Sequence, residues 1–162
     1  MKNVFFSSLL LLITNSVFGQ RSIEKTLEKL NKKSIPYITV EDLSAKINVT
    51  ILDTRKKEEY DISHLQNAIW VGYKKFNIDS LPIQNKKTNI IVYCSIGVRS
   101  EDIGEKLLAN GFTNVENLYG GIFKWIEKEY PVFDNNNQST NRVHIFSKYW
   151  GKLLTKGEKV LH

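Results

Sequence analysis

Short apolar runs alternate along this chain with segments whose apolar residues recur at helical spacing. The β-branched apolar runs at 49–52 and 89–93 are too short for helices and predict buried strands, and 115–118 predicts another. Helical spacing and helix-start signals predict helices at residues 22–32, after Thr39, at 100–110 and at 122–130. Strands that alternate with helices indicate an α/β fold, a parallel sheet with helices on both faces.

Two of the predicted helices carry end signals. Thr39 resembles the first residue of a capping box, and the helix that it opens is expected to carry Leu43 and Ile47 inward. The helix at 100–110 is followed by Gly111, which suits the left-handed position that closes a helix. These signals set the expected start of the first helix and the expected end of the second.

The first nineteen residues have the pattern of a secretory signal. Lys2 gives a positive start, an apolar run follows from Val4 to Ile13, and Gly19 is small. The uncharged stretch from Val4 to Phe18 is 15 residues long. A helix needs about 20 residues to cross a bilayer. We therefore predict a cleaved signal at residues 1–19 and an exported, periplasmic protein, with an uncleaved anchor as the alternative.

Composition places the chain among folded proteins. The 162 residues are 41% hydrophobic and contain a single cysteine, which excludes an internal disulfide and a thiolate-rich zinc site. No metal and no cofactor are expected. We predict one domain at residues 20–133, followed by a basic extension at 134–162 that begins with an Asn-rich linker.

The single cysteine, Cys94, directly follows the strand predicted at 89–93. Parallel sheets place reactive groups at the carboxyl ends of their strands. The next residues form a loop in which Gly97 permits a positive φ, Arg99 supplies a cation and the following helix, starting near Ser100, supplies its positive end. These features predict a pKa of Cys94 below the ordinary value of about 8.5. The alternative is a small buried apolar residue.

Four segments in this order resemble the single-domain rhodanese, or sulfurtransferase, family. They are Ile51-Leu52-Asp53-Thr54-Arg55 with Glu58-Glu59-Tyr60, then His64-Leu65-Gln66-Asn67-Ala68, then Val92 to Ser100, and finally Leu107 to Trp125. The resemblance covers roughly residues 36–131. It implies a three-layer α/β/α fold with a central, mostly parallel five-stranded sheet, which agrees with the pattern of predicted elements.

The resemblance also implies a mechanism. The Cys94 thiolate would take the outer sulfur of a donor such as thiosulfate, and an acceptor thiol or cyanide would then remove that sulfur from the Cys94 persulfide. The backbone amides of residues 96–99 would surround the persulfide. The implied substrate-binding loop is Ser95, Ile96, Gly97, Val98, Arg99 and Ser100.

Two other functions stay open. Cysteine phosphatases of the same fold use Cys-x5-Arg, whereas Cys94 and Arg99 form the shorter Cys-x4-Arg, which suits a single sulfur atom better than a phosphate, and no acidic residue lies within the loop. A non-catalytic sulfur carrier or binding module is the other alternative. Many thiosulfate-using members have a basic or longer polar residue where this chain has Ser95-Ile96.

Three further residues are expected to support the site. The resemblance implies that the Asp53 carboxylate holds the neighbouring loop. Arg55 is expected to pair with Glu58 or Glu59 rather than with substrate. For His64 we expect a hydrogen bond that fixes its turn, with a role as a proton shuttle as the alternative.

The basic extension holds +3 of the +5 charge expected after signal cleavage. Its linker, 134–141, is polar; beyond it Val143 and Ile145 alternate like a strand, and residues 150–154 predict a short helix. We expect this extension to fold back over the domain, with docking to a partner or to anionic lipid as the alternative. The expected partners are a sulfane-sulfur donor, a thiol acceptor and a thiol-reducing protein. We expect a monomer that binds no nucleic acid and inserts in no membrane after cleavage.

Overall fold

A computed structural model of the chain describes residues 23–161. The predicted signal at residues 1–19 lies outside these residues and stays a prediction. Within them, no helix is both long enough and apolar enough to cross a membrane. The described part begins with helical residues 23–30, inside the helix expected at 22–32.

The central sheet has five strands in the order β1-β5-β4-β2-β3, and every neighbouring pair is parallel. The elements run in chain order as β1 (Tyr37–Ile38), α2 (Val40–Ala45), β2 (Thr50–Asp53), α3 (Lys57–Ile62), β3 (Ile69–Trp70), the 3-10 helix η1 (Ile78–Ser80), β4 (Asn89–Tyr93), α4 (Val98–Ala109), β5 (Asn114–Leu118), α5 (Gly121–Glu127), β6 (Val132–Phe133), β7 (Ser139–Thr140), β8 (Arg142–His144), the 3-10 helix η2 (Trp150–Leu153) and β9 (Glu158–Val160). The predicted α/β fold with a parallel five-stranded sheet is confirmed.

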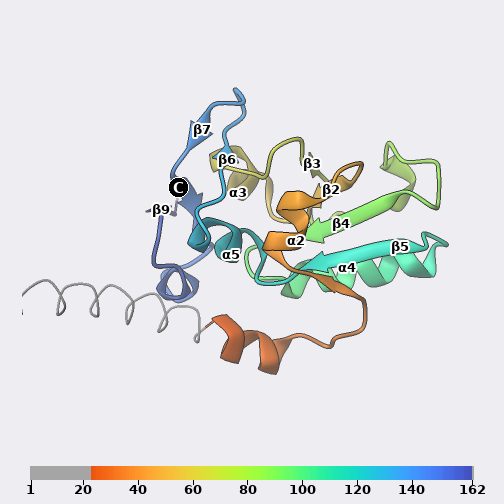
Figure 1. The fold of residues 1–162 in the computed structure, drawn as a ribbon, viewed down its shortest axis with the longest axis horizontal. Helices are drawn as coiled ribbons and strands as arrows, with labels where there is room; N and C mark the ends of the chain where they lie inside the picture. The colour runs from red at the N-terminus through yellow and green to blue at the C-terminus, as the bar shows by residue number, and fades with distance from the viewer. Residues whose placement is uncertain (1–22, 162) are drawn as a thin grey trace, which may run out of the picture.

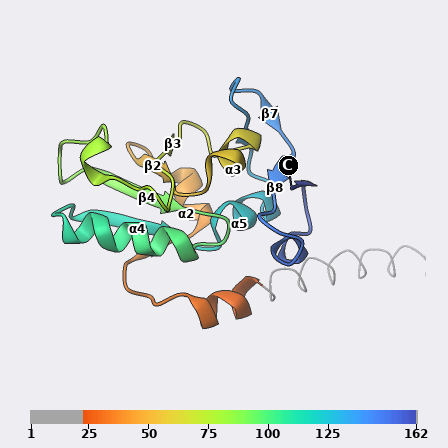
Figure 2. The ribbon, with the colours of Figure 1, turned by 180° about the vertical axis from the view of Figure 1, so that it is seen from behind.

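Strand β4 is buried on both faces of the sheet. Ile90 and Val92 pack in a core cluster with α4, while Ile91 and Tyr93 pack in a second cluster with α2 and α5. Alternate residues of a strand point to opposite faces, so a strand covered on both sides is apolar throughout. The two views show α2 and α4 on opposite sides of the sheet (Figures 1 and 2).

The helix-start signal at Thr39 is confirmed, because its side chain accepts a hydrogen bond from the Asp42 N–H at 3.1 Å. The expectation that Ile47 points inward is wrong: its side chain is 80% exposed. Helix α2 ends at Ala45 and the chain continues in extended conformation from Lys46, so helical spacing does not reach Ile47. Gly111 has the expected left-handed φ of +87°.

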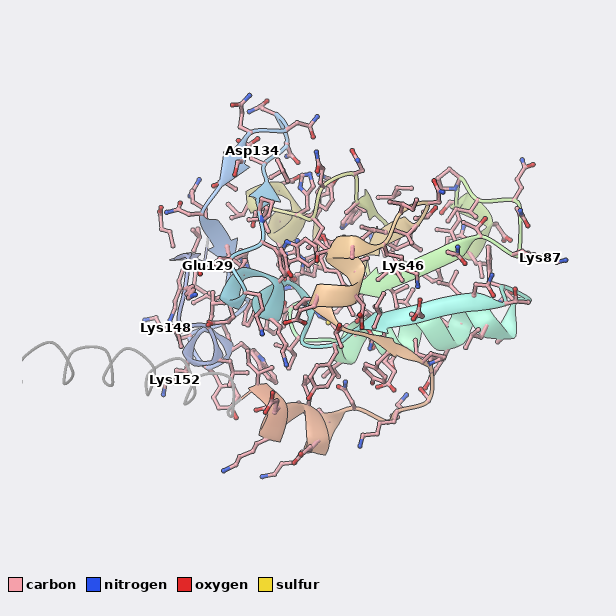
Figure 3. All side chains as sticks on the ribbon, in the orientation of Figure 1. Lys46, Lys87, Glu129, Asp134, Lys148 and Lys152 are labelled. Atoms are coloured by element: carbon pink, nitrogen blue, oxygen red, sulfur yellow. The ribbon has the colours of Figure 1, made fainter. Side chains whose placement is uncertain are left out.

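The C-terminal segment, residues 142–161, folds back over the domain as expected. Strands β8 and β9 pair in parallel, and Val143, Ile145, Leu153 and Leu154 are buried in the same core cluster as α5. The labelled Lys148 and Lys152 lie on the outside of this segment (Figure 3). The basic charge of the segment therefore faces solvent while its apolar residues complete the core.

The Asn-rich stretch is a hairpin rather than an extended linker. Strands β6 and β7 pair in antiparallel fashion on either side of it. The Asp134 carboxylate accepts hydrogen bonds from the N–H groups of Asn136 and Gln138 at 2.8 and 3.0 Å. Asp side chains commonly fix turns in this way, which explains how a segment without apolar residues adopts a defined shape.

Candidate active site

Cys94 lies at the carboxyl edge of the sheet, directly after β4. The arrowheads of β4 and β5 point towards α5 and the C-terminal segment (Figure 1). Gly97 precedes helix α4 and has a φ of +109°, a conformation that suits glycine. A side chain at this position would also approach the Leu118 carbonyl oxygen to 3.3 Å. Glycine therefore allows the chain to turn from strand to helix within three residues of Cys94.

The surroundings of the Cys94 sulfur favour the thiolate. Cys94 is 1% exposed, and the Gly97 N–H donates a hydrogen bond to Sγ at 3.1 Å. Burial raises the pKa of Cys94, but the Arg99 cation and hydrogen bonds from Ser100 and Gly97 outweigh it and hold the pKa below its ordinary value. The geometry thus brings together the groups that the sequence placed around Cys94.

The first turn of α5 holds the Cys94 loop by its backbone. The N–H groups of Ile122 and Phe123 donate hydrogen bonds to the carbonyl oxygens of Cys94 and Ser95, both at 3.0 Å. A Cβ atom on Gly121 would lie 2.3 Å from the Cys94 carbonyl oxygen. The absence of a side chain at Gly121 is what permits this close approach.

Asn117, in β5, holds the same loop from the neighbouring strand. Its side-chain amide donates to the Gly97 carbonyl oxygen, and its amide oxygen accepts from the Ser100 hydroxyl, both at 2.7 Å. Asn117 is fully buried. It was not among the site residues expected from the sequence, although a polar side chain within the predicted strand at 115–118 was a visible signal.

Glu59, in α3, completes the charged part of the site. Its two carboxylate oxygens accept hydrogen bonds from the Arg99 guanidinium at 2.8 and 2.9 Å, and the Ser95 hydroxyl donates to it at 3.0 Å. Burial raises the pKa of Glu59, but Arg99, together with the Arg55 charge and the Lys56 N–H, outweighs burial and lowers the pKa to about 2. The carboxylate is fully buried. Arg99 is thus a paired cation. The sequence had suggested Glu59 only as a partner for Arg55, not for Arg99.

Asp53 and Arg55 form a buried ion pair, with an Arg55 Nη2 to Asp53 Oδ2 distance of 2.6 Å. The expected pairing of Arg55 with Glu58 or Glu59 is wrong. Arg55 precedes α3, so it does not share a helix face with them, and its guanidinium instead donates to Asp53 and to the Ser63 carbonyl oxygen.

The Asp53 carboxylate also accepts a hydrogen bond from the Tyr93 hydroxyl at the end of β4. Burial raises the pKa of Tyr93, with the neighbouring Asp53 acting in the same direction. Since Tyr93 directly precedes Cys94, Asp53 helps to fix the end of the strand that carries the thiol. This geometry agrees with the loop-holding role expected for Asp53.

His64 fixes its turn by hydrogen bonding, as expected. Its Nδ1 lies 3.0 Å from the Tyr60 carbonyl oxygen, and its ring stacks on the Tyr60 ring with centroids 3.9 Å apart. His64 is not among the residues that line the cavity at Cys94. In the part of the chain that the structure describes, no three His, Cys, Asp or Glu side chains gather where they could hold a metal ion.

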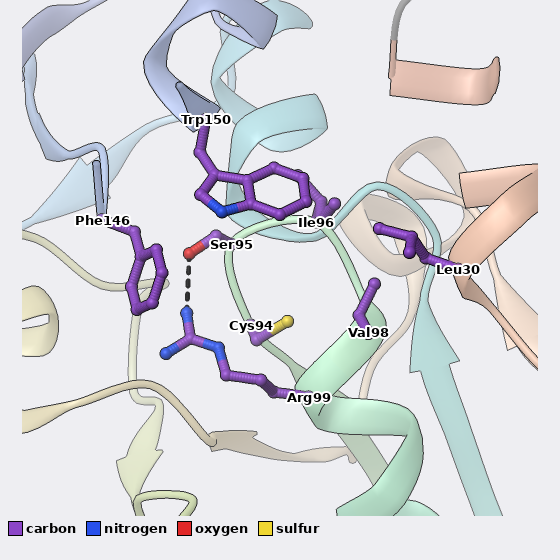
Figure 4. A pocket seen from close by; sticks show the side chains of 8 residues that line it. All are labelled: Leu30, Cys94, Ser95, Ile96, Val98, Arg99, Phe146 and Trp150. Atoms are coloured by element: carbon purple, nitrogen blue, oxygen red, sulfur yellow. Dashed lines mark hydrogen bonds between the residues drawn. The ribbon is translucent and has the colours of Figure 1, made fainter. Parts of the chain in front are cut away.

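A cavity of about 160 Å³ opens beside the Cys94 sulfur (Figure 4). Its walls are Leu30, Cys94, Ser95, Ile96, Val98, Arg99, Phe146 and Trp150. The cavity walls from outside the loop come from the helical residues 23–30 and from the C-terminal segment. Leu30, Phe146 and Trp150 were not expected at the site, because helical and strand spacing carries no information on contacts between distant segments.

A larger groove, of about 840 Å³, lies beside this cavity, and Arg99 and Phe146 border both. The Phe146 ring centroid is 4.8 Å from the Arg99 guanidinium carbon and 5.4 Å from the Lys56 amine. The lysines that line the groove are Lys56, Lys57, Lys74 and Lys75. An apolar cavity at the thiol thus adjoins a groove rich in positive charge.

Comparison with known proteins assigns the fold and loop to a family. Residues 39–128, more than half of the chain, match the family described as the rhodanese-like domain. The chain belongs to the rhodanese-like domain family. The match includes β2, β4, the Cys94 loop and α5, and it excludes Leu30, Phe146 and Trp150.

Individual relatives with similar sequences and folds support this assignment. A rhodanese-related protein from Thermoplasma volcanium has 30% identity and a TM-score of 0.55, over 60% of this chain and 97% of that one. A rhodanese-like domain protein from Staphylococcus aureus has 30% identity and a TM-score of 0.51, over 56% and 91%. A tRNA uridine(34) hydroxylase of Photorhabdus laumondii is 37% identical over 83 residues, 48% of this chain. The aligned part is 23% of that enzyme, so this rhodanese-like protein spans less than a quarter of its length.

Proposed function

We propose that this protein is a sulfurtransferase in which Cys94 carries the transferred sulfur. The Cys94 thiolate attacks the outer sulfur of a sulfane-sulfur donor. With thiosulfate, a bond forms between Cys94 Sγ and the outer sulfur, the sulfur–sulfur bond of the donor breaks, and sulfite leaves with the electron pair. An acceptor thiolate then attacks the outer sulfur of the Cys94 persulfide, which releases the Cys94 thiolate and an acceptor persulfide.

The observation that supports this proposal is the environment of the Cys94 sulfur, which is buried, hydrogen-bonded and close to Arg99. A buried thiol receives a backbone hydrogen bond at 3.1 Å and has its pKa lowered by Arg99, so the nucleophilic thiolate form is favoured over the thiol. The loop amides stabilise negative charge at this place, as is needed for both the thiolate and the terminal persulfide sulfur. Membership of the rhodanese-like domain family supports the same chemistry.

Sulfur loading of the intact protein tests the proposal. Incubation with thiosulfate or another sulfane donor is expected to add one sulfur atom by mass spectrometry, and added cyanide is expected to remove it as thiocyanate. Cys94→Ser is expected to abolish both, because the chain contains a single cysteine. Ser44→Ala, in α2, is the matched control and is expected to load normally.

The same assay separates the two alternative functions. Failure to load with any of several donors, in a folded protein, would contradict the sulfurtransferase and favour a binding module. Turnover of an aryl phosphate would favour a phosphatase. Against the phosphatase, Arg99 is engaged by both carboxylate oxygens of Glu59, and no acidic residue lies within the loop.

A further inference from the structure

The cavity at Cys94 is apolar on every side except at Arg99 and Ser95. Leu30, Phe146 and Trp150 contribute walls that lie outside the residues matched by the family. Figure 4 shows Phe146, Trp150 and Leu30 arranged around the mouth of the loop that holds Cys94. These segments therefore make the cavity largely apolar, a property that the Cys94 loop alone does not determine.

The charges at the cavity do not suit a dianion. Arg99 is the cation that lines it, and its guanidinium donates to Glu59 and to the Ser95 hydroxyl, at 2.8–2.9 Å. The Phe146 ring also covers the guanidinium at 4.8 Å. A dianion that enters would lose water and meet the charges of the Cys94 thiolate and Glu59, with Arg99 already paired.

The size of the cavity suits a small organic group. An apolar cavity of about 150 Å³ is sufficient to bind benzene, and this one measures about 160 Å³. Burial of an apolar group contributes roughly 25 cal/mol for each Å² removed from water. A donor with an organic body therefore gains binding free energy from walls that offer nothing to an inorganic anion.

We infer that the cavity selects sulfane-sulfur donors that combine one negative charge with an apolar organic body, over thiosulfate. This inference rests on the proposed sulfurtransferase function and names its donor class. An organic thiosulfonate has this chemistry. The Cys94 thiolate attacks its outer sulfur, the bond between that sulfur and the sulfonyl sulfur breaks, and an organic sulfinate leaves with the electron pair. Two negative charges enter this step and two leave it.

Phe146 offers a selective test because it borders both the cavity and the lysine-lined groove. Its φ is +61°, and Asn adopts this conformation more readily than other non-glycine residues. Phe146→Asn thus removes the aromatic wall, keeps a backbone-compatible residue and opens the cavity towards the lysines. Trp150→Leu is a second variant, which keeps an apolar side chain but removes the indole.

The experiment compares kcat/KM for benzenethiosulfonate, methanethiosulfonate and thiosulfate with cyanide as the acceptor. In the wild-type protein we expect benzenethiosulfonate to exceed thiosulfate at least tenfold, with methanethiosulfonate between them. Phe146→Asn and Trp150→Leu are expected to lower the ratio of benzenethiosulfonate to thiosulfate about tenfold, which corresponds to about 1.4 kcal/mol. Ile47→Asn, an exposed apolar residue before β2, is the control and is expected to keep the ratio.

The outcomes distinguish this inference from the proposed function. If the protein forms a persulfide but uses thiosulfate as well as benzenethiosulfonate, the donor class is wrong and the sulfurtransferase stands. If both variants lower the two activities equally, the aromatic walls are structural and the inference is also overturned. If no donor loads Cys94, the proposed function itself fails.

Discussion

At the scale of single residues, Glu59 connects the Cys94 loop to α3. Its carboxylate is buried, yet it is charged because Arg99 and Ser95 donate to it. Removal of one partner of a buried ion pair generally leaves the other without compensation. Glu59 therefore links the stability of the fold to the position of Arg99 beside the thiol.

Glu59→Gln is expected to lower the free energy of unfolding at neutral pH. The pKa of Glu59 falls from the usual 4.5 to about 2, which corresponds to about 3 kcal/mol. A depressed carboxylate pKa stabilises the fold fully above about pH 4.5, and this stabilisation is lost as the pH falls towards 2. Urea unfolding is expected to show a difference between variant and wild type that shrinks over this range.

Glu58→Gln is the matched control for this measurement, because Glu58 is the exposed neighbour of Glu59 in α3. Surface substitutions generally change stability by less than about 0.5 kcal/mol. Equal losses in the two variants would contradict the structural role of Glu59.

Alkylation of Cys94 is expected to reach its half-maximal rate at a lower pH than alkylation of an ordinary cysteine. Since Arg99 and the loop donors outweigh burial and lower the pKa of Cys94, the alkylation rate with iodoacetamide should reach half its maximum below the ordinary value of about pH 8.5. The double variant Arg99→Gln with Glu59→Gln is expected to move this midpoint to higher pH, because Arg99 is the strongest stabilising charge on the thiolate.

The double variant avoids an unpaired buried Glu59, so loss of the fold does not obscure the result. Circular dichroism of each variant checks that the fold is intact. A midpoint that stays unchanged after both substitutions would show that Arg99 does not set the pKa of Cys94.

At the scale of elements, α5 supports the Cys94 loop through Gly121. This glycine has a φ of +55°, and a Cβ on it would meet the Cys94 carbonyl oxygen at 2.3 Å. Gly121→Ala is expected to lower the free energy of unfolding by about 2 kcal/mol more than a glycine substitution without a clash. It is also expected to reduce sulfur loading, because the displaced loop no longer presents its amides to the sulfur.

Gly111→Ala provides that comparison. Gly111 has a positive φ of +87°, but a Cβ on it would meet nothing within 4 Å. Its substitution therefore carries the conformational cost alone. Urea unfolding and mass spectrometry on both variants measure the difference, and equal behaviour would contradict the contact between Gly121 and the Cys94 loop.

The elements and the loop are largely predictable from the sequence, whereas the walls of the cavity are not. The strand at 89–93 and the thiol after it follow from local apolar runs and turn residues. Phe146 and Trp150 reach Cys94 through the folding of a segment about 50 residues away, and no local spacing encodes that contact. Arg55 shows a different limit: its partner, Asp53, is only two residues away, but the residue types alone do not show which of several nearby carboxylates the guanidinium meets.

At the scale of the whole molecule, the C-terminal segment is part of the core. Leu154 is 1% exposed and belongs to the cluster that also contains Ile122 and Phe123. Leu154→Ala is expected to lower the free energy of unfolding by about 3 kcal/mol, measured by urea unfolding, because burial is lost and a cavity is left. Ile47→Ala, at an 80% exposed position, is expected to have little effect.

A loss near zero for Leu154→Ala would mean that the segment is an independent appendage, which would contradict its place in the core. A substantial loss would instead show that residues beyond the family match are needed for a stable domain. The result therefore bears on where this domain ends as well as on how it is packed.

The placement of Phe146 and Trp150 affects how chains of this kind are compared and produced. A recombinant protein trimmed to residues 39–128 would keep the nucleophile and discard three cavity walls and part of the core. Grouping related chains by their cysteine loops would likewise leave these three walls out of the comparison. The segments that flank the shared domain are the more informative place to search for differences in specificity.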